Sequence, residues 1–299
     1  MATEYLTGFS SNRLLQHGAC ITMVLLLSAC SMGQMVVRGT QTILDSGIES
    51  MNRETDLQLA REAMPANLKL IEGMLIEDPN NSELRLFAAE GFYGYSFGFI
   101  EAEDVDRARL LYRRCYSHAR KALQRSGIQV DPESASTQEL QAAVDAAGEK
   151  SVPALFWSAS CLGKWIDLNR DNPGGIAALS GVAAMMQRVI ELDNEFYFGG
   201  AHLFFGVYYG GRSPMFGGNF AQSEKSFQRA AEINKNRLLL VDVLRAEYLD
   251  HQKLDQQAFH ARLQKVISAA DDLYPEMALV NGISKQRARR LLAIEKDWF

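Results

Sequence analysis

A small–aromatic–small pattern at helical spacing recurs along this sequence and restricts its fold more than any other feature. In the clearest copy, Ser223 is followed by Phe227 four residues later and by Ala230 three residues after that, and Asn234 stands near the next turn. Residues at these offsets share one face of an α-helix. Small side chains on that face let a partner helix approach closely, and the aromatic ring fills the groove one turn along. The pattern therefore predicts helices that pack in pairs.

Three further segments carry this pattern less perfectly, with bulkier residues or with only its closing turn. The offsets are those of the second helix of a tetratricopeptide repeat, and we expect about four degenerate repeats. Hairpins that each bury a single face must stack. The predicted fold is therefore all-α, with antiparallel helical hairpins stacked into a tetratricopeptide-like, right-handed solenoid. The three segments contain Ala108, Tyr112 and Cys115; Val182, Met186 and Val189; and Leu68 up to the Asp78–Pro79–Asn80 turn.

From Glu54 onward the apolar residues follow a 3.6-residue period, and we find no convincing alternating strand. Short polar or Gly/Pro turns separate the periodic segments. The predicted helices are 55–77, 82–100, 104–125, 137–147, 153–169, 174–192, 195–210, 219–233, 237–250, 255–270 and 275–296.

The first thirty residues have the character of a targeting segment. Arg13 precedes a short apolar stretch at 19–27, which is too short to span a bilayer. The sequence Leu-Ser-Ala-Cys, ending at Cys30, follows directly and resembles the bacterial lipobox, in which the cysteine is acylated and becomes the new N-terminus. A plain secretory signal with a chance cysteine is the alternative.

The lipobox resemblance implies three parts: a lipoprotein signal peptide at 1–29, a lipidated tether at 30–53 and the helical domain at 54–299. Several acyl chains on one residue hold a protein stably at a membrane. Ser31 follows the cysteine, where an Asp would suggest retention in the inner membrane. We therefore expect a periplasmic protein with a lipid anchor in the outer membrane.

Four cysteines are present in the sequence. Cys20 leaves with the signal peptide and Cys30 is consumed by lipid, so Cys115 and Cys161 remain. Both lie in predicted helices among apolar neighbours. A disulfide between them is possible in an oxidising periplasm, but we expect buried free thiols.

The net charge and the length of the apolar runs argue against two classes of protein. With a formal net charge of -5 and no long basic stretch, the chain lacks the electrostatic footprint of a nucleic-acid-binding protein. No apolar run beyond residue 30 approaches the length of a bilayer crossing, so a multi-spanning membrane protein is not expected. We expect the basic run 287–290 to form the solvated face of a terminal helix, with a contact to anionic lipid or an acidic partner as the alternative.

No motif in the sequence predicts catalysis, and we expect no enzyme, no metal and no cofactor. Residues 94–98 match G-x-S-x-G, but that motif needs a strained strand-to-helix turn. The segment before them is helical in pattern, and Gly91, Gly94 and Gly98 share one helix face suited to close packing. The histidines show neither H-E-x-x-H nor metal-ligand spacing.

Aromatic residues and glycines are concentrated in three segments, 92–99, 156–165 and 196–220. Most of these side chains fit the core of a repeat protein. The Gly-rich turn with Arg212 and Met215, however, is longer than a repeat needs, and long turns often carry function. Aromatic residues with a polar tip also suit a cavity that is partly wet.

Two of these segments resemble the T component of TRAP-associated transport systems (the TatT family). The likeness lies in Pro153 to Ala159, in Gly163 to Ile166 and in Tyr208 to Asn219. It covers roughly residues 54–275 and includes the paired tryptophans, the Gly-Gly turn, the lipobox and the Asp78–Pro79–Asn80 turn.

The resemblance implies a non-catalytic periplasmic lipoprotein that works with a TRAP-type solute-binding protein. It also implies a homo-oligomer, for which a trimer is our expectation, and a channel for a small hydrophobic or carboxylate ligand. Met215 and Phe216 are bulkier than the residues usual there, which bears on the width of the channel. The residues that the resemblance assigns to the channel are Phe156, Trp157, Trp165, Tyr208, Tyr209, Arg212, Met215 and Phe216.

An alternative function belongs to another class: a tetratricopeptide scaffold lipoprotein for outer-membrane or cell-wall assembly, in which the aromatic residues only pack. The extended aromatic turn and the paired tryptophans favour ligand handling.

Overall fold

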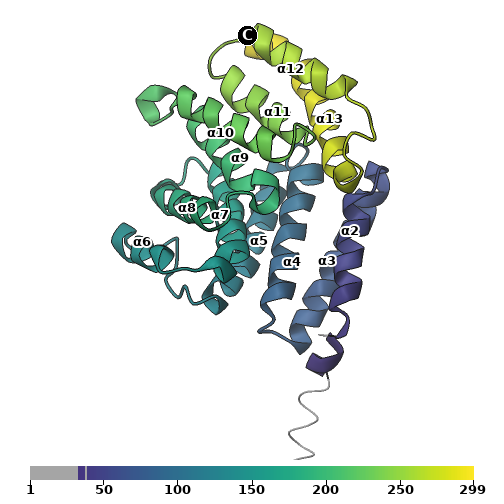
Figure 1. The fold of residues 1–299 in the computed structure, drawn as a ribbon, viewed down its shortest axis with the longest axis vertical. Helices are drawn as coiled ribbons and strands as arrows, with labels where there is room; N and C mark the ends of the chain where they lie inside the picture. The colour runs from purple at the N-terminus through teal and green to yellow at the C-terminus, as the bar shows by residue number, and fades with distance from the viewer. Residues whose placement is uncertain (1–32, 38) are drawn as a thin grey trace, which may run out of the picture.

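The structure is a computed structural model that describes residues 33–37 and 39–299. This part of the chain forms α-helices with short 3-10 and π-helical segments and contains no strand, which confirms the all-α prediction. Figure 1 shows the helices stacked from α3 to α12, with α13 returning to the end of α2. The main helices are α2 (Gln41–Asn52), α3 (Leu57–Glu77), α4 (Ser82–Tyr95), α5 (Val105–Arg125), α6 (Thr137–Asp145), α7 (Val152–Asp167), α8 (Pro173–Leu192), α9 (Phe196–Gly210), α10 (Phe220–Ile233), α11 (Leu240–Arg245), α12 (Gln256–Ser268) and α13 (Ala278–Ala293).

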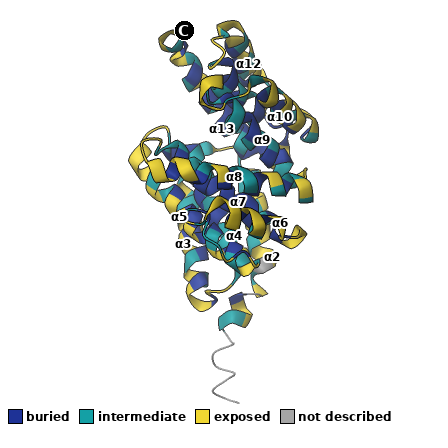
Figure 2. Cartoon of the chain, turned by 90° about the vertical axis from the view of Figure 1, so that its left-hand side faces the viewer, coloured by how far each residue is buried: buried dark blue, intermediate teal, exposed yellow. Residues whose placement is uncertain are grey.

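Helices that follow each other in sequence pack as hairpins: α4 with α5, α7 with α8, and α9 with α10. The repeat pattern lies inside these hairpins, since Tyr112 and Phe227 are 0% and 1% exposed. An ideal Cβ atom on Gly206 of α9 would stand 2.7 Å from the ring of Phe227. A glycine on one helix thus makes room for the aromatic ring of its partner, and the hairpin prediction is confirmed. Buried residues gather where helices face one another, as Figure 2 shows.

Polar side chains cap the N-termini of many of these helices. Asp56, Asn81, Asp104, Asn172 and Asn219 each accept a hydrogen bond from a backbone N–H group of the first turn that follows. Such caps satisfy donors that have no partner within the helix. The predicted turns therefore end one helix and start the next in the same few residues.

The G-x-S-x-G match lies within helix, as predicted. Gly94 belongs to α4, and the π-helical segment η1 (Ser96–Ile100) continues α4 without a break. Cβ atoms on Gly91 and Gly98 would stand 2.7 Å from side-chain atoms of Leu68 and Ile283. These glycines therefore serve close helix packing.

Helical structure begins earlier than residue 54. Residues Gln41–Asn52, assigned to the tether by the sequence, form α2, which packs against α13 and the 3-10 segment η5 (Pro275–Met277). The apolar residues of α2 repeat at helical spacing, so the segment can form an amphipathic helix once a partner face exists. The predicted signal peptide and Cys30 lie outside the described residues.

Helix α8 corrects the expectation that no apolar segment beyond residue 30 approaches the length of a bilayer crossing. The helix has 20 residues, and its most apolar 18-residue window has a mean hydropathy of 1.3, so it is long and apolar enough to cross a membrane by length and composition. The helix pairs instead with α7 and also contacts α6 and α9, and Val182, Met185 and Val189 are fully buried there. These contacts bury 39% of the apolar window inside the protein.

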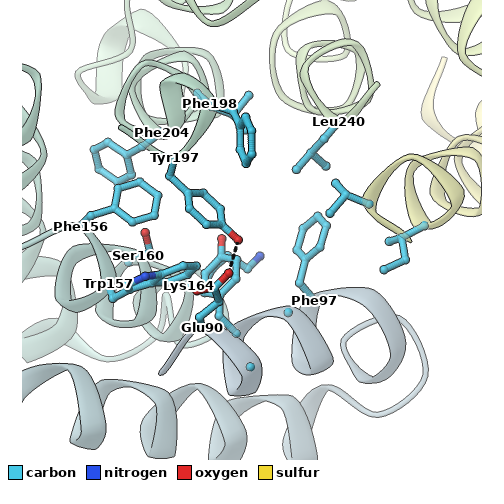
Figure 3. A pocket seen from close by; sticks show the side chains of 18 of the residues that line it. Glu90, Phe97, Phe156, Trp157, Ser160, Lys164, Tyr197, Phe198, Phe204 and Leu240 are labelled. Atoms are coloured by element: carbon cyan, nitrogen blue, oxygen red, sulfur yellow. Dashed lines mark hydrogen bonds between the residues drawn. The ribbon is translucent and has the colours of Figure 1, made fainter. Parts of the chain in front are cut away.

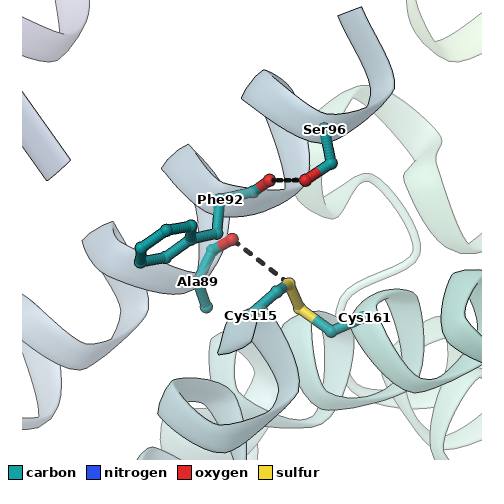
Figure 4. Close-up of a disulfide and its surroundings, with 5 residues drawn as sticks. All are labelled: Ala89, Phe92, Ser96, Cys115 and Cys161. Atoms are coloured by element: carbon teal, nitrogen blue, oxygen red, sulfur yellow. Dashed lines mark hydrogen bonds between the residues drawn. A yellow bond between two sulfur atoms is a disulfide. The ribbon is translucent and has the colours of Figure 1, made fainter. Parts of the chain in front are cut away.

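The expectation of free thiols at Cys115 and Cys161 is wrong, because the two residues form a disulfide that joins α5 to α7. Their Cα atoms lie 5.6 Å apart, within the usual range for such a bond. Close packing of α5 on α7 brings them together, a contact between segments 46 residues apart that sequence spacing did not reveal. Figure 4 shows the bond beside the backbone of α4 at Ala89.

Candidate ligand cavity

A cavity of about 590 Å³ lies on the inner side of the helical stack, between the first hairpins and the C-terminal helices. Its volume is in the range of small-molecule sites. Side chains of α2, α3, α4, α7, α8, α9, α11 and α13 line it, and most of them are apolar or aromatic. Figure 3 shows how aromatic rings from η1, α7 and α9 converge on its interior.

The central wall is a group of aromatic rings in edge-on and tilted contact. Phe156 and Trp157 lie side by side on α7 with ring centroids 5.1 Å apart. The ring of Tyr197 lies 4.9 Å from Trp157 and 5.3 Å from Phe156, and Tyr93 of α4 lies 5.7 Å from Trp157. Each ring fixes the position of its neighbours at distances typical of favourable aromatic pairs.

The start of α9 is bent so that Tyr197 enters this group. Tyr197, Phe198 and Gly199 have φ angles of 48°, 60° and 78°, all in the left-handed region that L-residues other than glycine rarely adopt. Gly200 is needed next to them, because a Cβ atom there would stand 2.6 Å from the ring of Phe156. Two non-glycine residues in this region imply a local cost of about 1–3 kcal/mol each, which surrounding contacts must offset.

Glu90 of α4 carries a carboxyl group into the aromatic wall. The Tyr197 hydroxyl donates a hydrogen bond of 2.9 Å to its Oε1 atom, and Figure 3 shows the two side chains meeting in the cavity. Among the described residues no Lys, Arg or His forms an ion pair with Glu90. Burial raises the pKa of this carboxyl, and the hydrogen bond from Tyr197 offsets only part of that rise.

Lys164 lines the cavity but is neutralised by acidic neighbours. Its Nζ atom lies 2.9 Å from Glu101 and 3.0 Å from Asp167. Burial disfavours the charged ammonium, but the carboxylates, with Glu101 foremost, outweigh it and hold the pKa of Lys164 well above its usual value. Tyr112 donates a further hydrogen bond of 2.6 Å to Glu101. This end of the wall is therefore a closed ionic cluster.

Arg287 belongs to the same cluster, and its place corrects the expectation that residues 287–290 form a solvated face. Its side chain is buried, with its Nε and Nη2 atoms each 2.8 Å from the Glu247 carboxylate and Nη2 also 3.6 Å from Glu101. The guanidinium also lies over the ring of Phe97, 4.7 Å from its centroid. Only burial of α13 against the stack made these partners available.

Tyr208 and Arg212 mark the end of the cavity where α9 runs into the 211–219 loop. The Arg212 guanidinium lies 4.0 Å from the Tyr208 ring centroid and donates hydrogen bonds of 3.0 and 3.1 Å to the Tyr208 carbonyl oxygen. It forms no ion pair with an acid of the described chain. A guanidinium so placed can accept an anionic group.

The eight residues that the sequence assigned to a channel divide into two groups. Phe156, Trp157, Tyr208 and Arg212 line the cavity. The structure places the other four outside its lining. Trp165 lies beneath the guanidinium of Arg113 and beside Gly175, Tyr209 packs on Phe205, and Met215 and Phe216 are 90% and 77% exposed on the 3-10 segment η3 (Pro214–Phe216).

Sequence reasoning missed the polar residues of the cavity and its C-terminal wall. Glu90 and Lys164 stand within or beside aromatic segments that were singled out, so an isolated charge in an aromatic helix was the available indication. For Ile283 and the residues of α2 the sequence gave no indication, because their contacts depend on how distant helices pack. No group of three or more His, Cys, Asp or Glu side chains in the described ranges is arranged to hold a metal ion.

Comparison with known proteins identifies a matching family and a similar protein. A family model for the TRAP transporter T-component matches residues 53–299, which includes every helix from α3 onward. The chain is also similar to an uncharacterized protein of Treponema pallidum (strain Nichols). The two are 22% identical over 265 residues, which cover 82% of this chain and 81% of that protein.

Proposed function

Because the match spans residues 53–299, this chain belongs to the TRAP transporter T-component family, and on that premise we propose that it is a non-catalytic periplasmic lipoprotein that handles a small ligand for a TRAP-type solute-binding protein. The observation that carries the proposal is the cavity: about 590 Å³, partly open to solvent and lined by apolar and aromatic side chains from most of the helical stack. Packing alone would fill such a space.

The chemistry of the lining supports a ligand with a hydrophobic body or a carboxylate. Rings such as Phe156 and Trp157 offer an apolar wall, and Arg212 offers a guanidinium at the loop end of the cavity. In this proposal Trp165 supports the wall from behind. The family supports a place in a TRAP transport system; the periplasmic location, the outer-membrane anchor through Cys30 and the trimer are parts of the proposal.

Tryptophan fluorescence tests the ligand. Of the three tryptophans in the chain, Trp157 lines the cavity, so an apolar or carboxylate ligand should quench or shift its emission. Trp157→Phe should abolish the response, while Trp165→Phe and Trp298→Phe should preserve it. An unchanged spectrum across a broad ligand panel would contradict the proposal and favour a purely structural aromatic core.

Co-purification tests the partner. The acylated protein, tagged at Phe299 and released mildly from the envelope, should bring down a periplasmic TRAP solute-binding protein identified by mass spectrometry. Recovery of outer-membrane or cell-wall assembly proteins instead would favour the scaffold function. Light scattering on a variant without Cys30 should give three times the protomer mass, and a monomer would contradict the trimer.

A further inference from the structure

The cavity lining and the ionic cluster beside it contain charged groups whose partners can be counted one by one. Lys164 is balanced by Glu101 and Asp167, and Arg287 by Glu247. Arg170 also pairs with Asp167. Three cations and three carboxylates therefore neutralise one another. Two charged side chains of the described lining remain outside this balance: Arg212 at the loop end and Glu90 in the aromatic wall.

Glu90 stands where a cation would be favoured from two sides. Its carboxyl has one neutral hydrogen-bond donor, the Tyr197 hydroxyl at 2.9 Å. Trp157 and Tyr197 lie near it in Figure 3, and Tyr93, which also lines the cavity, contacts Trp157. Electron-rich aromatic faces attract cations, and aromatic cages are the usual sites for quaternary ammonium groups. A carboxylate beside such rings adds a direct counter-charge.

The backbone is built to hold this arrangement. Tyr197 reaches Glu90 only because Tyr197, Phe198 and Gly199 adopt left-handed angles, and that conformation is costly for the first two. Strain of this kind persists where the surrounding structure enforces it, and it gathers at ligand sites.

We propose that Glu90 and the rings of Tyr93, Trp157 and Tyr197 form a cation-recognition site, so that the ligand carries a protonated amine or quaternary ammonium on its apolar body. This inference rests on the proposed ligand-handling function and adds the charge of the ligand to it. Arg212, at the other unbalanced position, would contact an anionic group if the same ligand bears one.

Ionisation of Glu90 couples this recognition to pH. Burial raises the pKa of the Glu90 carboxyl, so an arriving ammonium must displace a proton when the pH is low. Affinity for a cationic ligand should therefore fall as the pH drops through that raised pKa, whereas affinity for an uncharged analogue should not change.

The experiment compares three probes that share one apolar tail: decyltrimethylammonium, decanol and decanoate, each below its micelle-forming concentration. Binding is followed by tryptophan fluorescence on the full mature chain with Cys30→Ser and the disulfide intact. We expect the ammonium to bind about tenfold more tightly than decanol. In Glu90→Gln this preference should vanish while decanol affinity is kept. Glu83→Gln, on α4 but outside the cavity lining, is the matched control.

The outcomes separate this inference from the function on which it rests. Equal binding of all three probes, or an ammonium preference that survives Glu90→Gln, overturns the cation site and leaves the apolar cavity intact. Tighter binding of decanoate, lost in Arg212→Gln, also overturns it and identifies an anionic ligand. If no probe binds, the ligand-handling proposal itself fails and the cation site with it.

Discussion

At the scale of single residues, the conformation of Tyr197 decides the chemistry of the cavity. Its left-handed backbone directs a phenol onto Glu90 across more than a hundred residues of sequence. The hydroxyl then stabilises a carboxyl that has no cation partner among the described residues. The polar character of the cavity wall therefore depends on a backbone feature that side-chain identity alone does not predict.

The ionisation of Glu90 gives a stability prediction with a definite sign. Burial raises the folded-state pKa of Glu90 above its usual 4.5. Stability from this group is therefore full below the unfolded-state pKa and is lost as the pH rises through the folded-state pKa. Glu90→Gln removes that loss, so its melting temperature should exceed the wild-type value at pH 7.5 and match it near pH 4. Thermal melts followed by circular dichroism measure this, and a variant less stable than wild type at both pH values would contradict it.

At the scale of elements, helices are held together by matched faces and by one covalent bond. Glycine on α9 faces Phe227 on α10, and Cys115 on α5 is bonded to Cys161 on α7. Both contacts are local to one pair of helices, so each can be removed without touching the cavity wall.

Removing the disulfide should lower stability but not change the fold. The bond closes a loop of 46 residues, and chain entropy then gives about 4 kcal/mol relative to the open chain. Cys115→Ala/Cys161→Ala should therefore shift the urea midpoint down. Reductant should shift the wild type by a similar amount and leave the double variant unaffected. If reductant does not shift the urea midpoint of the wild type, the thiols of Cys115 and Cys161 are unpaired in solution.

The η3 segment offers a contrasting case, because its apolar side chains support no packing. Met215 and Phe216 are 90% and 77% exposed, and exposed apolar groups of this size often mark contact surfaces. Met215→Ser/Phe216→Ser should leave the melting temperature unchanged and reduce recovery of the solute-binding protein in the co-purification. Leu254→Ser, at another exposed apolar site, is the control and should not reduce recovery.

At the scale of the whole molecule, the cavity is lined by segments from both ends of the described chain. Helix α2 contributes Leu44, Ile48 and Met51 to the lining, and α13 contributes Ile283. The two helices contact one another. In sequence, α2 is the first long helix after the predicted lipid anchor at Cys30.

Deleting residues before Arg53 should therefore open the cavity without unfolding the hairpins. The family match itself begins at residue 53, and α3 to α13 keep their mutual contacts. We expect association and dissociation of an apolar ligand to be faster in the truncated chain than in the chain with Cys30→Ser, as followed by stopped-flow tryptophan fluorescence. Equal rates in the two proteins would show that α2 does not limit access.

The sequence by itself determined the elements of this protein. Helix periodicity, polar caps and Gly/Pro turns are local properties, so the predicted ranges agree with α3 to α13 to within a few residues. The small–aromatic–small pattern also predicted which faces pack, because Ser223, Phe227 and Ala230 lie buried against a neighbouring helix. Half of the predicted channel residues line the cavity for the same reason: they stand in conspicuous aromatic segments.

Tertiary structure alone decided which distant groups meet. The disulfide, the burial of Arg287 and the pairing of Glu90 with Tyr197 each join residues tens of positions apart, and no local pattern encodes such distances. The cavity likewise exists only after α2, α9 and α13 enclose a common space. Local interactions are fixed by neighbours in sequence, whereas charge pairing and cavity shape depend on the relative placement of whole helices.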